Sequence, residues 1–246
     1  MHELSSVISH NFDHVVNFSA RIRFSPEKDW PINAGLDGVI AKLEGISRGD
    51  VSMADVIVLA GYTAIENDGG NTMPFCGNRV DASDAAYSEN LAPRDYYLTT
   101  EAKVKDDIVV RGMTLKQGVA LYGMPTEVFA FGEIFSILKT GTVSSATVKT
   151  GTVSSGTVTA NGETYALTAE QEALVNDLAL KAIVDEYADD EAAFKTAFAE
   201  AWVYMMNAGR YTGPTSNYCD DPSSAFAVSA AVTVGGVLAL ALALIM

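Results

Sequence analysis

Histidine and cysteine, two residue types common in acid–base catalysis and metal binding, are few in this chain. Its three histidines, His2, His10 and His14, all lie near the N-terminus, and its two cysteines, Cys76 and Cys219, are far apart in the sequence. The Cys and His residues do not form a set with the spacing of a metal site, so the sequence predicts no metal centre. The cysteines either pair in an oxidising compartment or remain two unrelated thiols.

The overall charge excludes one class of partner. The chain has 246 residues and a formal net charge of -15, and its Lys and Arg residues form no clusters. Because binding a polyanion requires clustered basic residues, we expect no nucleic-acid partner. A hydrophobic fraction of 48% is sufficient for a sizeable core, in either one large domain or two small ones.

The clearest element that could position functional residues is a helix over Met53–Ile65. Ser52 followed by Asp55 is typical of a helix start. The residues that follow are apolar on nearly every side, which predicts a helix buried in a core. Residues 67–70, Asn-Asp-Gly-Gly, predict its end, and the next loop carries Arg79 and Asp81.

Further helices are predicted on the C-terminal side. Capping boxes pair Thr114 with Gln117 and Thr168 with Gln171, and each marks a helix start. A later helix places four large side chains on one face: Phe194, Phe198, Trp202 and Met205. Residues 77–112 show no long amphipathic period, so they predict extended loops with short turns.

A near-exact ten-residue duplicate lies within residues 139–160, where KTGTVSSATV is followed by KTGTVSSGTV. Alternating Thr and Val between these breaks predicts short antiparallel strands. Asn161-Gly162 predicts a hairpin turn before residues 163–167. The alternative is a low-complexity segment without a role in the core.

The C-terminal segment over residues 225–246 carries no charge. As a helix it would be about 33 Å long, enough to span a bilayer. A buried core helix and a removable lipid-anchor signal are the alternatives. We therefore expect a folded domain over residues 1–215, a short linker over 216–224 and a transmembrane helix over 225–246.

Several of these segments together resemble the class I haem peroxidases, namely ascorbate peroxidase, cytochrome c peroxidase and both halves of catalase-peroxidase. The resembling segments are SMADVIVLAG with MPFCGNRVDAS, then NFSARIRF, and AWVYMMNAGRY near the end. The last is most similar to the C-terminal half of catalase-peroxidase, which carries no haem. The resemblance covers Asn17 to Tyr211. It implies a mainly α, haem-peroxidase-like helical domain with a small β-hairpin insert, from which the family's first helix is absent.

The resemblance assigns the distal, peroxide-cleaving positions to the N-terminal region. The family pattern R-x-x-W-H matches Ser6 at the arginine, Ser9 at the tryptophan and His10 at the histidine. A register based on His14 also lacks the arginine, and a histidine in a surface loop is the structural alternative. Asn33 holds the position of the asparagine that orients the distal histidine. Asn33 could also cap the helix that follows it.

The proximal positions are assigned by VALYGMPT, which is similar to the family's V-A-L-S-G-x-H-T. Pro125 stands where the family has the histidine that binds haem iron, and proline has no atom that could bind it. The aspartate that supports this histidine in active members matches Gln171, or Glu170 in a register one residue away.

These substitutions predict that haem is absent and that the chain has no catalytic residues. We expect a catalytically inactive, membrane-anchored accessory or structural subunit of a membrane complex. Anchored ascorbate peroxidases occur in chloroplast membranes, which favours a thylakoid complex, with the mitochondrial inner membrane as the second choice. The alternatives are an active haem peroxidase that removes hydrogen peroxide, with haem held by one of the three histidines, and a small-molecule or pigment pocket in the vacated haem cavity.

Overall fold

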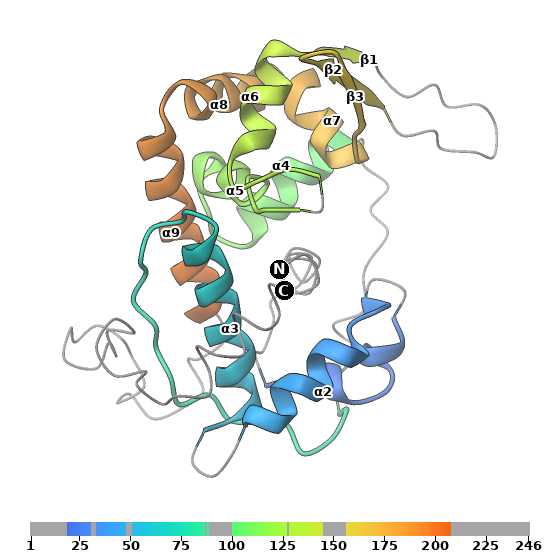
Figure 1. The fold of residues 1–246 in the computed structure, drawn as a ribbon, viewed down its shortest axis with the longest axis vertical. Helices are drawn as coiled ribbons and strands as arrows, with labels where there is room; N and C mark the ends of the chain where they lie inside the picture. The colour runs from blue at the N-terminus through green and yellow to red at the C-terminus, as the bar shows by residue number, and fades with distance from the viewer. Residues whose placement is uncertain are drawn as a thin grey trace. The chain divides into compact units, whose positions relative to one another are not determined.

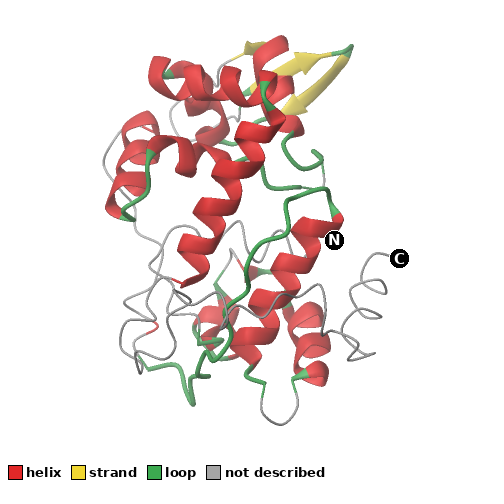
Figure 2. Cartoon of the chain, turned by 90° about the vertical axis from the view of Figure 1, so that its left-hand side faces the viewer, coloured by secondary structure: helices red, strands yellow, loops and turns green. Residues whose placement is uncertain are grey.

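The computed structural model describes residues 19–30, 33–47, 51–86, 88, 100–126, 128–144 and 156–207. Over these residues the chain is mainly helical with one small sheet, as Figures 1 and 2 show. The chain forms two compact units. Unit 1 comprises the residues up to Arg94 and from Trp202 onward, and unit 2 comprises Asp95–Ala201.

Unit 1 is built around helix α3 (Met53–Asn67). No side chain between Met53 and Glu66 is exposed, so the predicted apolar, buried helix is confirmed. Helix α2 (Asp37–Ile46) packs against it, and two 3-10 turns, η2 (Arg21–Arg23) and η3 (Glu27–Asp29), precede α2 in the chain. In α2, Val39, Ile40 and Leu43 are buried.

The start of α3 differs in detail from a full capping box. The Ser52 hydroxyl accepts a hydrogen bond from the Asp55 backbone N–H at 3.1 Å, as expected. The Asp55 carboxylate does not return to the cap, because it binds Arg79 instead. The Asp81 carboxylate accepts from the backbone N–H groups of Met53 and Ala54 at 2.9 and 2.8 Å. A residue from a distant loop therefore completes this cap.

Unit 2 begins with helix α4 (Thr100–Val110), where the sequence predicted extended loops; that prediction was wrong for these residues. Only Val104 and Ile108 of α4 are buried. Two apolar residues are too few to produce a recognisable helical periodicity in the sequence. Its place is set by packing on α7, and Lys103 and Lys105 form ion pairs with Glu170 and Asp177.

Both predicted capping boxes in unit 2 are confirmed. Thr114 starts α5 (Leu115–Leu121), and Thr168 starts α7 (Ala169–Asn176). The remaining helices are α6 (Glu133–Thr140), α8 (Leu178–Asp189) and α9 (Glu191–Asn207).

The predicted strands form a three-stranded antiparallel sheet in the order β1 (Thr142–Ser144), β2 (Thr157–Ala160) and β3 (Glu163–Ala166). The predicted hairpin turn is confirmed, since Asn161 and Gly162 both have positive φ and join β2 to β3. Val158 of β2 is fully buried, and β2 packs on α6. Figure 1 shows this sheet beside α6 and α7.

Aromatic rings form the centre of unit 2. Phe194 packs against Phe131, Phe135, Tyr187 and Phe198 with ring centroids 4.8 to 6.0 Å apart. Burial of such rings and their edge-to-face contacts stabilises this unit.

Helix α9 contributes buried side chains to both units. Its four predicted apolar residues, Phe194, Phe198, Trp202 and Met205, are at most 7% exposed, which confirms the predicted face. Among the described residues, no helix has the length and apolar character needed to cross a membrane. The predicted span over residues 225–246 lies outside the described part of the chain.

Candidate functional site

The positions assigned by the peroxidase resemblance fall into different parts of the chain. Asn33 lies in unit 1, and Pro125 and Gln171 lie in unit 2. The predicted distal residues Ser6, Ser9 and His10, and the alternative His14, lie outside the described residues.

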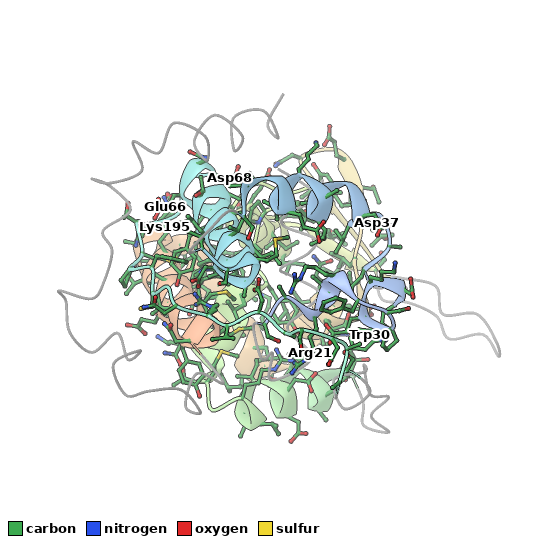
Figure 3. The ribbon with its side chains drawn as sticks, turned by 90° about the horizontal axis from the view of Figure 1, so that it is seen from below. Arg21, Trp30, Asp37, Glu66, Asp68 and Lys195 are labelled. Carbon is green, nitrogen blue, oxygen red and sulfur yellow. The ribbon has the colours of Figure 1, made fainter. Side chains whose placement is uncertain are left out.

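Asn33 is held in a tight polar turn of unit 1. It is 5% exposed, and its Nδ2 donates a hydrogen bond to the Glu27 backbone carbonyl at 2.7 Å. The proposed capping role was wrong, because α2 begins four residues later with Leu36 as its cap and no side-chain cap bond. The Asn33 side chain instead fixes the turn that contains η3. Arg21 and Trp30, labelled in Figure 3, belong to the same part of unit 1 as Asn33.

The oxygen of the Asn33 side-chain amide is available to accept a hydrogen bond. Asn33 Oδ1 is buried and has no hydrogen-bond partner among the described residues. An unsatisfied buried acceptor costs about 1–3 kcal/mol, so such atoms normally accept a hydrogen bond. The position that the resemblance assigns to orienting a histidine thus retains an acceptor.

A carboxylate adjoins this turn. Glu27 Oε1 accepts a hydrogen bond from the hydroxyl of fully buried Ser88 at 2.7 Å. Desolvation raises the pKa of the Glu27 carboxyl above its ordinary value, and the Ser88 hydrogen bond and the charge of Arg21 oppose that shift.

A buried ion pair anchors the loop after α3. Arg79 Nη1 lies 2.8 Å from Asp55 Oδ1, and the two side chains are 2% and 10% exposed. The guanidinium also donates to the backbone carbonyls of Cys76 and Met206 and lies over the Phe75 ring. These bonds satisfy most of its donors, which is the condition for burying a charge. The sequence signal for this pair was an acidic residue in the first turn of an apolar helix, followed by a loop with arginine.

The cysteine of this loop is also buried. Cys76 is 2% exposed and disulfide-bonded. Cys219, the other cysteine of the sequence, lies outside the described residues.

Pro125 lies in the loop after α5. Helix α5 ends at Leu121, and Pro125 is buried in non-helical backbone. The loop is closed by a hydrogen bond from the Gly132 N–H to the Gly123 carbonyl at 2.8 Å. A Cβ on Gly123 would lie 2.5 Å from Phe194, so only glycine fits against the aromatic rings here. At the matched position the loop therefore presents a proline ring, which cannot bind a metal ion.

Gln171 serves the cap of α7. Its Oε1 accepts from the Thr168 backbone N–H at 2.9 Å, and its own N–H donates to the Thr168 hydroxyl at 3.1 Å. The alternative Glu170 pairs with Lys103 at 3.7 Å. Both candidates for the family's supporting aspartate thus have structural partners within unit 2. Among the described residues, no three His, Cys, Asp or Glu side chains gather as a metal-binding group.

Comparison with known proteins places the chain in a family. Residues 17–190 match the family described as Peroxidase. Catalase-peroxidase of Ruegeria pomeroyi (strain ATCC 700808 / DSM 15171 / DSS-3) is 31% identical over 240 residues, which is 78% of this chain and 33% of that protein. Catalase-peroxidase of Ruegeria sp. (strain TM1040) is 29% identical over 243 residues, with the same shares. A shorter match to catalase-peroxidase of Pseudomonas entomophila (strain L48) is 49% identical over 74 residues, or 27% of this chain and 10% of that protein.

The chain thus spans about a third of the length of these catalase-peroxidases. The matched region includes Asn33, Asp55, Arg79, Pro125 and Gln171. A mainly helical fold with one small sheet agrees with this match. The chain therefore belongs to the peroxidase family, as a member of the class I haem peroxidase superfamily.

Proposed function

We propose that this chain is a catalytically inactive, haem-free member of the peroxidase family and that it serves as a membrane-anchored accessory or structural subunit of a membrane complex. The observation that carries the proposal is Pro125, at the position matched to the haem-binding histidine. Iron in this family requires an imidazole nitrogen there, and the proline ring has none.

The surroundings of Pro125 support the same conclusion. The polypeptide has left helical geometry by this point, and Gly123 is fixed against Phe194 and Phe135. Gln171, at the matched position of the supporting aspartate, is committed to the α7 cap. The residues at the matched positions in unit 2 therefore do not fit an axially ligated haem, and no peroxidase step is derived for this chain.

Membrane attachment is the second part of the proposal. It rests on the uncharged sequence of residues 225–246, which is long enough for one span. A thylakoid complex is the preferred setting, because anchored ascorbate peroxidases occur in chloroplast membranes, and the mitochondrial inner membrane is the second choice.

One observation favours an alternative function, an active haem peroxidase that removes hydrogen peroxide. Asn33 Oδ1 is a buried acceptor with no partner among the described residues, and the family uses this position to orient a distal histidine. His10 and His14 precede it in the sequence. The alternative also needs an iron ligand from one of the histidines outside the described residues.

Haem titration separates these two functions. We expect the full-length purified chain, incubated with haemin and then passed over a desalting column, to show no stoichiometric Soret band. A catalase-peroxidase treated in the same way serves as the positive control. A Soret band at one haem per chain, with peroxide-dependent oxidation of a chromogenic donor, would refute the proposal.

The variant Pro125→His tests whether the missing imidazole is the reason for the expected lack of haem binding. We expect it to bind more haem than the wild-type chain, with the spectrum of a histidine-ligated iron. Val128→His is the matched control, because Val128 is 56% exposed in the same loop and a histidine there reports nonspecific binding. Equal haem binding by both variants would show that position 125 has no special relation to haem.

The membrane proposal has its own test. We expect the full-length chain to float with phospholipid vesicles, and Val234→Arg with Leu238→Arg to abolish flotation, since each arginine near the centre of a span costs about 2.5–3.5 kcal/mol. Flotation of the double variant would refute a transmembrane span.

The proposed role in a membrane complex needs a separate test. The chain is purified in mild detergent, and the subunits that migrate with it are identified. Migration as an isolated chain would refute this role.

A further inference from the structure

We propose that the outer edge of β3 is a docking site for an extended, positively charged segment of a partner protein, which adds to the sheet as a further antiparallel strand. The sheet order is β1-β2-β3, so in the described part of the chain β3 has a neighbouring strand on one side only. Three of its residues, Glu163, Thr164 and Ala166, are exposed, and Tyr165 is half-buried. The proposal depends neither on haem binding nor on membrane attachment.

The hairpin geometry decides which backbone groups of β3 point outward. Ala160 pairs with Glu163 across a two-residue turn whose residues both have positive φ. Such a turn is flanked by a hydrogen-bonded pair, and hydrogen-bonded and non-hydrogen-bonded pairs then alternate along the two strands. The bond from the Leu167 N–H to the Gly156 carbonyl at 2.8 Å follows the same alternation.

This alternation places Thr164 and Ala166 at non-hydrogen-bonded positions, opposite Thr159 and Thr157 of β2. The hydroxyl oxygens of Thr159 and Thr164 lie 2.9 Å apart, as expected for the close side chains of such a pair. The backbone N–H and C=O groups of Thr164 and Ala166 therefore point away from β2. Among the turn, loop and cap hydrogen bonds of the described residues, none reaches these groups. The edge thus presents donors and acceptors in the pattern that an added antiparallel strand requires.

The opposite edge of the sheet is a poorer site. In β1, Thr142 and Ser144 lie opposite Thr159 and Thr157, whose backbone groups point toward β1. The backbone groups of Thr142 and Ser144 are thus used within the sheet, and only Val143 of β1 has groups that point outward. A single residue cannot hold an added strand, so the site is assigned to β3.

The charges beside the β3 edge favour a basic partner. The Glu163 carboxylate accepts a hydrogen bond from the Tyr165 hydroxyl at 2.5 Å. That bond, followed by desolvation and the charges of Glu163 and Glu133, raises the pKa of the Tyr165 hydroxyl above its ordinary value, so Glu133 also acts at this edge. Neither carboxylate forms an ion pair with a Lys or Arg among the described residues. A Lys or Arg of an added strand would therefore be attracted by both carboxylates.

Apolar surface lies at the same place. The Tyr165 ring packs on the Phe129 ring with centroids 5.2 Å apart, and Val128, next to Phe129, is 56% exposed. Tyr165 and Glu163 share one face of β3, because side chains alternate along a strand. On an antiparallel partner, the residue opposite Tyr165 comes two positions before the residue opposite Glu163. We therefore expect the partner segment to carry an apolar residue followed two positions later by Lys or Arg.

Charge also argues against a second copy of this chain as the occupant. Two β3 edges side by side would bring the Glu163 and Glu133 carboxylates of both chains together, and each chain has a formal net charge of -15. Like charges destabilise strand pairs, and charged residues on short edge strands prevent association between identical edges. With a basic segment the same carboxylates attract the partner.

Peptide binding to the full-length chain in mild detergent tests the proposal. The probe is the peptide KTVTKTK with an amino-terminal fluorescein and a carboxy-terminal amide, in which a lysine follows the valine by two positions. We expect saturable binding, measured by fluorescence anisotropy, that weakens as the salt concentration rises.

The variant Thr164→Pro removes one outward N–H group, and we expect it to weaken binding about tenfold. Proline is tolerated on an edge strand where the N–H faces solvent, so the sheet should persist, and circular dichroism checks this. Thr164→Val is the matched control, because it loses the same hydroxyl contact with Thr159 but keeps the N–H group. We expect it to bind the probe as the wild-type chain does.

The double variant Glu133→Gln/Glu163→Gln tests the role of charge. Each glutamine keeps an acceptor, for the Ala130 N–H and the Tyr165 hydroxyl respectively, so the local hydrogen bonds are retained. We expect weaker binding with a smaller dependence on salt. Unchanged binding and salt dependence would contradict the assignment of a basic partner.

Two modified probes leave the protein unchanged and decide the question even if Thr164→Pro does not fold. N-methylation of the two threonines that flank the valine removes the N–H groups that pair with the edge, and we expect it to abolish binding. N-methylation of the valine and of the lysine two positions later removes N–H groups that point away from β3, and we expect binding to persist.

Four outcomes would overturn the proposal. The unmodified probe shows no saturable binding, or both methylated probes bind equally well, which would mean charge attraction without strand pairing. Folded Thr164→Pro binds the probe as tightly as the wild-type chain. The full-length chain forms a dimer in sedimentation equilibrium that Thr164→Pro abolishes, which would assign the edge to a second copy instead.

Discussion

The turn that holds Asn33 and the loop that holds Pro125 are built in different ways. The Asn33 turn is polar: the side chain bonds the Glu27 carbonyl, and Glu27 bonds Ser88. The Pro125 loop follows Gly123, which lies against the rings of Phe194 and Phe135. Charge and hydrogen bonding thus organise the first region, whereas ring packing organises the second.

The two regions also differ in the residues that they carry at the positions matched to the peroxidase family. At Asn33, which the resemblance matches to the family's asparagine, one polar atom of the side chain lacks a partner among the described residues. Pro125 and Gln171 stand where the resemblance places the family's histidine and aspartate, and the Gln171 side chain completes a helix cap. Unit 1 therefore retains a polar group with spare bonding capacity, while in unit 2 the matched positions have structural roles.

The largest expected effect comes from the ion pair that anchors unit 1. Arg79→Leu leaves the buried Asp55 carboxylate without its partner, and we expect a loss of about 3–5 kcal/mol in the free energy of unfolding. Urea titration measures the loss, and buried charges predict little change with salt. The double variant Asp55→Leu/Arg79→Leu should recover much of the stability; if it is as unstable as the sum of both single variants, the pair is not coupled.

A comparable loss is expected from the aromatic centre of unit 2. Phe194→Ala removes a ring that contacts four others, and truncation of a buried phenylalanine costs about 3–5 kcal/mol. Phe194→Leu is the matched control and should lose less, because it keeps most of the buried volume. Thermal unfolding followed by circular dichroism gives both values. Equal losses for the two variants would argue against ring packing as the source of stability.

A smaller effect is expected at Gln171. Gln171→Ala breaks half of the α7 capping box, and we expect a loss of about 0.5–2 kcal/mol, as for removal of other helix caps. Gln117→Ala at the start of α5 is the matched control, with the same geometry at a position unrelated to the proximal site. A much larger loss at Gln171 than at Gln117 would indicate that Gln171 does more than cap α7.

The smallest effect concerns Glu27, and its sign follows from the raised pKa. The folded protein binds this proton more tightly than the unfolded chain, so the stabilising contribution is fully present below the ordinary pKa of glutamate. It is lost as the pH rises through the raised value. Glu27→Gln keeps an acceptor for Ser88 and removes the titration, so its stability should depend less on pH in this acidic range. Parallel pH dependences of wild type and variant, measured by urea unfolding, would contradict this assignment.

Local patterns accounted for much of the fold. The buried α3, both capping boxes and the Asn161-Gly162 turn were predictable because each depends on residues within a few positions of one another. Helix α4 was missed because Val104 and Ile108 alone form its buried stripe, and its other support comes from Glu170 and Asp177.

For the candidate site, the sequence by itself determined that position 125 has no iron-binding atom, because proline lacks one in any conformation. It also determined that a ten-residue sequence occurs twice with a single change. Only the tertiary structure decided that Asp55 pairs with Arg79, that Gln171 closes a cap, and that Gly156 lies against Glu172. These facts depend on contacts between residues distant in the chain or on the choice among several partners, which no local pattern specifies.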